Sequence, residues 1–193
     1  MKKILSLTLA LAMILTLFAG CGKTSADGQT SATGQAPETA ATTEAAASVE
    51  GTMEELLNKI VEIQPVEFFG ETMTIDLTDT SEEGLWNFQS HTGLENADEV
   101  TDVAFFEPMM GSIAYSMVAV RVNNEVGTKS VAEAMKAGIN PRKWVCVEAN
   151  DILVAGYADV VLFIMLDTEG GLTAQGFVDA FQQVVGADLE FVI

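Results

Sequence analysis

The side chains that most often carry catalysis or bind metals are scarce in this chain: two of its 193 residues are cysteine and one is histidine. His91 lies between Ser90 and Thr92, where the pattern predicts a helix end or a loop. Catalysis of the Ser-His-Asp or Cys-His type needs a base within reach of a nucleophile, and no nucleophile-elbow pattern is present. We therefore expect His91 to be a surface or helix-capping residue. One histidine and one buried cysteine cannot supply the usual zinc ligands, and no glycine-rich phosphate loop appears, so the sequence predicts no metal site and no cofactor.

Cys21 follows a segment typical of bacterial export signals. Met1-Lys2-Lys3 is positively charged, and the apolar run 4–19 is shorter than the roughly 20 residues of a membrane-spanning helix. Ala19-Gly20-Cys21 resembles a lipobox, although Phe18 stands where leucine is usual. The resemblance implies that 1–20 is a signal peptide removed before Cys21, and that the Cys21 thiol carries diacylglycerol. An uncleaved signal anchor is the alternative.

Cys146 lies in the run Lys143–Val147, whose β-branched and aromatic residues predict a buried strand. A cysteine in such a strand packs as a small hydrophobic residue. We therefore expect Cys146 to belong to the core, and a reactive thiol is the alternative. If Cys21 is lipidated, no partner remains for an intramolecular disulfide.

The basic residues of 51–193 are concentrated in one stretch, because five of the six lie between 121 and 143. Arg142, Lys143 and Trp144 together are a candidate patch for an anion or a partner protein. The alternative is that these basic side chains pair with acidic residues of the same domain.

Acidic residues form two groups that could bind a hard cation through oxygen ligands. Neither group has the alternating acids and central glycine of an EF-hand loop. A solvated acidic surface is the simpler interpretation, and weak divalent-cation binding or paired catalytic carboxylates are the alternatives. The first group is Asp76, Asp79, Glu82 and Glu83, and the second is Glu95, Asp98, Glu99 and Asp102.

Charge and composition divide the chain into three parts. The net charge of −19 argues against nucleic-acid binding. Residues 22–50 contain no Leu, Ile, Met or aromatic side chain, which predicts a disordered linker over 21–50 with a span of roughly 30 Å. The acidic domain 51–193 would be repelled by an anionic membrane, so lipid on Cys21 would provide the attachment to the extracytoplasmic face of the cell membrane.

Hydrophobic periodicity predicts an α+β domain. Its strands should form a small, mostly antiparallel sheet covered by helices on one face. We expect helices over 53–63, 80–90, 130–137 and 172–185, and strands over 103–106, 113–122, 143–147, 152–155, 160–166 and 189–193.

Two segments resemble a known family. Glu107-Pro108-Met109-Met110-Gly111-Ser112-Ile113-Ala114-Tyr115-Ser116 and Asn140-Pro141-Arg142-Lys143-Trp144-Val145-Cys146-Val147 are similar to small domains of unknown function in lipoproteins of Gram-positive bacteria, chiefly Firmicutes. The resemblance covers about Trp86 to Met165. It implies no activity, ligand or catalytic residue.

These observations predict a lipid-anchored, extracytoplasmic lipoprotein whose domain is a non-catalytic binding or interaction module at the cell envelope. The partner could be an envelope protein or a small molecule. The alternatives are an envelope enzyme that uses carboxylates or Arg142, and a weak divalent-cation-binding domain.

Overall fold

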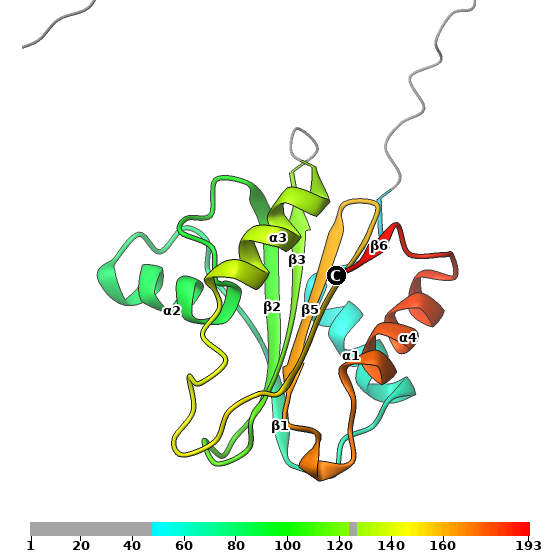
Figure 1. The fold of residues 1–193 in the computed structure, drawn as a ribbon. Helices are drawn as coiled ribbons and strands as arrows, with labels where there is room; N and C mark the ends of the chain where they lie inside the picture. Colours follow the sequence, from blue (N-terminus) through cyan, green and yellow to red (C-terminus); the bar gives the residue numbers. More distant parts are fainter. Residues whose placement is uncertain (1–47, 124–126) are drawn as a thin grey trace, which may run out of the picture. The chain divides into compact units, whose positions relative to one another are not determined.

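The structure is a computed structural model that describes residues 48–123 and 127–193 (Figure 1). In this part of the chain four helices accompany a six-stranded sheet of order β1-β2-β3-β5-β4-β6, in which every neighbouring pair is antiparallel. The α+β class and the antiparallel sheet are therefore confirmed. The helices are α1 (Met53–Ile63), α2 (Glu82–Thr92), α3 (Thr128–Gly138) and α4 (Ala174–Val185), with a 3₁₀ turn η1 (Thr168–Gly170) before α4. The strands are β1 (Gly70–Thr74), β2 (Val100–Pro108), β3 (Tyr115–Val122), β4 (Asp151–Tyr157), β5 (Val160–Leu166) and β6 (Phe191–Val192).

Capping residues mark where two of the helices begin. Helix α1 begins after Thr52, which forms a capping box with Glu55: the Thr52 side chain accepts from the Glu55 amide and the Glu55 carboxylate accepts from the Thr52 amide. Ser81 caps α2 by accepting from the Gly84 amide. The predicted helix 53–63 is confirmed at both ends.

The helices cover both faces of the sheet, so the prediction of one covered face is wrong. Strand β5 shows the reason, because all seven of its residues are buried and successive side chains point to opposite faces. One set, which includes Leu162 and Ile164, packs with α1 and α4, and the other, which includes Phe163, packs with α2 and α3. Figure 1 shows α1 and α4 on one side of the sheet and α2 and α3 on the other. Two cores of similar size result.

The C-terminal ends of α2 and α3 meet at two glycines. Gly93 ends α2 in the left-handed conformation, with φ of 73°. A Cβ atom on Gly138 would lie 1.9 Å from the carbonyl oxygen of Gly93, far inside van der Waals contact. This close approach therefore requires glycine at position 138.

Residues 48–51 are held to the domain by an ion pair at the Arg121 end of β3. Arg121 pairs with Asp159 and donates to the carbonyl oxygens of Val49 (2.9 Å) and Gly51 (2.7 Å). Asp159 also accepts from the Ser48 hydroxyl at 2.7 Å and from the Val49 amide at 2.9 Å. Contacts with the domain thus begin three residues before the predicted start at residue 51.

Among the helices that the structure describes, none has the length and hydrophobicity needed to cross a membrane.

Candidate functional site

A cluster of polar side chains surrounds one carboxylate oxygen of Glu107 at the end of β2. Ser116, at the start of β3, donates its hydroxyl to Glu107 Oε1 at 2.6 Å. His91, in the last turn of α2, places Nδ1 3.1 Å from the same oxygen. Lys143, in the segment between α3 and β4, donates to it as well. Side chains from three other parts of the chain therefore converge on one oxygen of Glu107.

These groups are held in place by close packing. The ring of His91 stacks on Phe105 with centroids 3.7 Å apart and an interplanar angle of 15°. Lys143 Nζ also lies 3.3 Å from the Ser116 hydroxyl and 3.4 Å from the Ser90 carbonyl oxygen. The side chains of His91, Glu107 and Lys143 are only 13–16% exposed. His91 was expected at the surface or in a cap, but it lies in this half-buried cluster.

Opposing effects set the pKa values in the cluster. Burial raises the pKa of Glu107, but the hydrogen bond with His91 and the charge of Lys143 outweigh it and lower the pKa to about 2. Burial lowers the pKa of Lys143 below its ordinary value, against the opposing effect of Glu107. The carboxylate is therefore ionised at neutral pH.

The arrangement supports a structural role better than catalysis. A Ser-Lys pair can carry acyl transfer when the lysine accepts the serine proton and substrate reaches the hydroxyl. Here Ser116 has no exposed surface, and its hydroxyl donates a hydrogen bond to Glu107. The cluster instead joins the segment 139–150 to the sheet through Lys143.

The segment 139–150 is a loop, so the predicted strand 143–147 is wrong. Cys146 has φ of 66°, which no strand adopts, and its thiol is free and exposed. The expected burial of Cys146 is therefore wrong as well. Hydrogen bonds across the loop, from the Ala149 amide to the Pro141 carbonyl (2.9 Å) and from the Val145 amide to the Gly111 carbonyl (3.3 Å), fix its path. The Val145 amide is thus paired outside the sheet ladder.

The three residues of the candidate patch point in different directions. Lys143 is directed inward to Glu107. Trp144 is half-buried against the core beneath α2 and α3, with Lys143 Nζ 5.6 Å from its ring centroid. Arg142 is 76% exposed and pairs with Glu148 at 2.9 Å. Their joint role in anion or partner binding stays a prediction, with Arg142 as the exposed cation.

The two acidic groups contribute to one cavity of about 310 Å³. Asp76 and Asp79 of the first group and Asp98 of the second line it, together with Leu85 and Phe88. Asp76 is already engaged by Thr78, which lowers its pKa through side-chain and backbone hydrogen bonds. Across 48–123 and 127–193, no three His, Cys, Asp or Glu side chains are placed to hold a metal ion.

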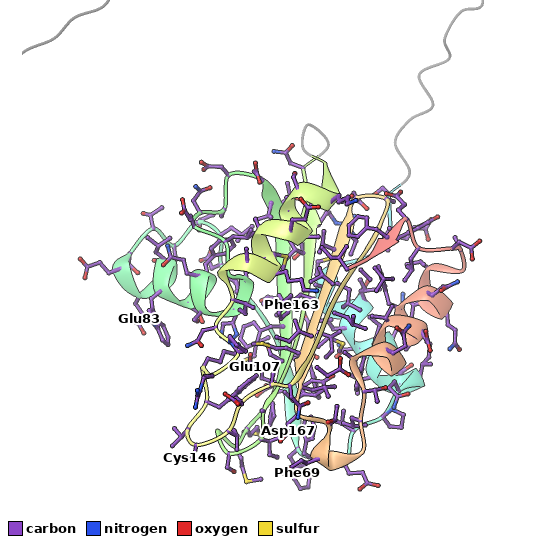
Figure 2. The ribbon with its side chains drawn as sticks, in the orientation of Figure 1. Phe69, Glu83, Glu107, Cys146, Phe163 and Asp167 are labelled. Atoms are coloured by element: carbon purple, nitrogen blue, oxygen red, sulfur yellow. The ribbon has the colours of Figure 1, made fainter. Side chains whose placement is uncertain are left out.

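Four exposed apolar side chains lie on three neighbouring segments at one end of the sheet. Phe69 precedes β1, Met109 and Met110 follow β2, and Val145 lies in the loop 139–150; their exposed fractions are 88, 74, 58 and 74%. The Met109 amide donates to the Phe69 carbonyl at 3.0 Å, and the Val145 amide donates to Gly111. We call these four residues the apolar tip. Figure 2 shows Phe69 and Cys146 at this end of the domain.

A larger cavity, of about 610 Å³, opens at the same end of the sheet. Its walls are mostly apolar, and its two charged residues are the carboxylates Glu67 and Asp167. Asp167 caps η1 and accepts from the Asn150 amide group at 2.7 Å. The apolar wall residues are Pro65, Val66, Phe68, Ile113, Ala114, Tyr115, Val147, Leu166 and Leu172.

Sequence reasoning missed the Glu107 cluster, the apolar tip and the larger cavity. Met109 and Met110 lie in the turn between β2 and β3, and both are exposed. Pro108 and Gly111 flank these two methionines and indicate a turn. That turn is the sequence signal from which their exposure could have been predicted. Cys21 lies outside the described residues, so its lipidation stays a prediction.

Comparison of the chain with known protein families, with curated proteins and with solved structures finds no match. The resemblance to the Gram-positive lipoprotein domains therefore stays a prediction.

Proposed function

We propose that this chain is a lipid-anchored, extracytoplasmic binding module that contacts an envelope protein through the apolar tip and catalyses no reaction. The observation that carries the proposal is the exposure of Phe69, Met109, Met110 and Val145 on adjacent segments. Large exposed apolar groups at one place on a soluble domain are typical of interaction surfaces.

The position of the tip favours a protein partner over the membrane. Strand β3 runs from Tyr115 beside the tip to Arg121, where Ser48 and Val49 join the domain. The tip is thus at the end of the sheet opposite the point where the chain enters. Residues 51–193 carry 24 acidic and six basic side chains, which opposes close approach to an anionic membrane.

The contacts that hold the loop 139–150 support the same function. Lys143 fixes the loop to Glu107, and Arg142 pairs with Glu148 within it. Val145 is therefore presented on a preorganised surface, which lowers the entropy cost of binding.

The enzyme alternative lacks a comparable observation. The His91, Ser116 and Lys143 side chains are engaged around Glu107. At the larger cavity, one oxygen of Asp167, Oδ1, accepts hydrogen bonds from both Asn150 and the Glu169 amide.

The anchor is tested by lipid labelling of the full chain in cells. We expect wild type to incorporate labelled fatty acid, and Cys21→Ala or globomycin to abolish labelling and leave a longer precursor. Unchanged labelling and mobility of Cys21→Ala would reject lipid attachment at this residue.

The tip is tested by affinity capture from envelope extract with the full chain as bait. Phe69→Ser with Val145→Ser should lose the captured protein, because both changes remove exposed apolar contact area. Trp86→Ser is the matched control, since Trp86 is 69% exposed on α2 outside the tip. Equal capture by the tip variant and wild type would exclude the tip as the interface.

A further inference from the structure

We infer that the cavity of about 610 Å³ at the β3–β5 end of the sheet binds a small organic cation with an apolar body. Its volume lies within the range of roughly 300–1,000 Å³ that is usual for small-molecule sites. The inference goes beyond the proposed function, because the residues of this cavity are not those of the apolar tip.

The walls select an apolar body. Segments before β1, before β3 and before α4 contribute Val66, Phe68, Ile113 and Leu172, all of which are half-buried. Tyr115, at the back of the same site, is buried and packs edge-on against Phe68 with ring centroids 5.1 Å apart. An alkyl or aryl group entering here would leave water on contact with these side chains.

The charges select a cation. Glu67 and Asp167 line the cavity, and none of its lining residues is Lys, Arg or His. Glu67 is exposed and Asp167 is half-buried, so one carboxylate is accessible at the rim and the other lies partly out of water. An ammonium group gains from both, whereas an anion of the same shape is repelled by both.

An aromatic side chain adds to the same preference. Phe68 is a half-buried lining residue, and aromatic rings attract organic cations. A positive charge on an apolar body therefore suits the two carboxylates and the apolar side chains of this wall.

Three probes of nearly equal shape test the inference on the full chain: 4-phenylbutylammonium, 4-phenylbutanol and 4-phenylbutyrate. Binding is followed by amide chemical shifts. We expect the ammonium probe to bind about tenfold more tightly than the carboxylate, with the alcohol between them, and to shift amides of Val66, Ile113 and Leu172. Equal or reversed affinities, or shifts confined to another surface, would overturn the inference.

Matched variants separate charge from folding. Glu67→Gln with Asp167→Asn should remove most of the preference for the ammonium probe, and the uncharged alcohol reports any loss of binding that comes from a changed wall and not from lost charge. Glu71→Gln is the control, because Glu71 is an exposed glutamate of β1 outside the cavity wall. If the double variant retains the full preference, carboxylate recognition at this cavity is excluded. Partner capture by the apolar tip is a separate measurement, so failure of either proposal leaves the other standing.

Discussion

Lys143 and Glu107 are 36 residues apart in sequence, yet the ammonium group of Lys143 donates to the carboxylate oxygen that also accepts from Ser116. This contact holds the loop 139–150 against the ends of β2 and β3. Val145, one of the four residues of the apolar tip, lies two residues after Lys143 in the same loop.

Replacing Lys143 by methionine should destabilise the domain and weaken partner capture. The change leaves the largely buried carboxylate of Glu107 without its cation, which we expect to cost about 3–5 kcal/mol. Urea unfolding of the full chain measures the free energy. Arg142→Met is the control: its ion pair with Glu148 is mostly exposed and should be worth no more than about 1 kcal/mol. Equal losses in the two variants would contradict the structural role of Lys143.

Lowering the pH should reduce the free energy of unfolding, because Glu107 becomes protonated. Its pKa is about 2 in the folded protein and 4.5 ordinarily, so the unfolded chain takes up the proton first as pH decreases. The carboxylate therefore contributes roughly 3 kcal/mol at neutral pH, and this contribution disappears between pH 4.5 and 2. The difference in unfolding free energy between wild type and Glu107→Gln should narrow over that range. If the difference in unfolding free energy stays constant from pH 7 to pH 2.5, the pKa of Glu107 is not lowered in the folded protein.

Cys146 should react rapidly with a maleimide in the native protein. The thiol is exposed on the loop, so we expect complete modification without denaturant, measured as a mass increase by mass spectrometry. Cys146→Ala should remove this labelling. Modification that requires urea would place Cys146 in the core instead.

Replacing Gly138 by alanine should destabilise the junction of α2 and α3. Alanine favours a helix by about 1 kcal/mol over glycine, but its Cβ would collide with the Gly93 carbonyl oxygen. We expect a net loss of about 2–4 kcal/mol, at or somewhat above the usual cost of overpacking. Gly111→Ala is the control, since a Cβ at that position would contact nothing within 4 Å. Similar thermal unfolding of the two variants would argue against the predicted clash.

The parts of the fold that could be predicted carry their signal within a few residues. The Thr52 and Glu55 capping box predicts the start of α1, and the seven apolar residues of β5 indicate a central strand. Strand β1 was missed because Gly70–Thr74 is a largely exposed edge strand without a run of apolar residues. It is specified by its pairing with β2, which sequence periodicity does not reveal.

The candidate site could not be predicted because its contacts are long-range. Glu107 meets His91, Ser116 and Lys143 at separations of 16, 9 and 36 residues. The loop around Cys146 has a composition that favours a strand, and tertiary contacts of Lys143 and Trp144 override this preference. The candidate patch of Arg142, Lys143 and Trp144 lies in the right segment, but the sequence does not reveal that Lys143 points inward.

Photo-crosslinking in the cells that make the protein tests the central claim most directly. A photoreactive residue at Val145 of the full chain should give one defined adduct with an envelope protein, and Phe69→Ser should reduce that adduct. The same residue at Trp86 should give none. No adduct from Val145, a dimer of this chain alone, or the same adducts from Val145 and Trp86 would contradict recognition of an envelope protein by the apolar tip.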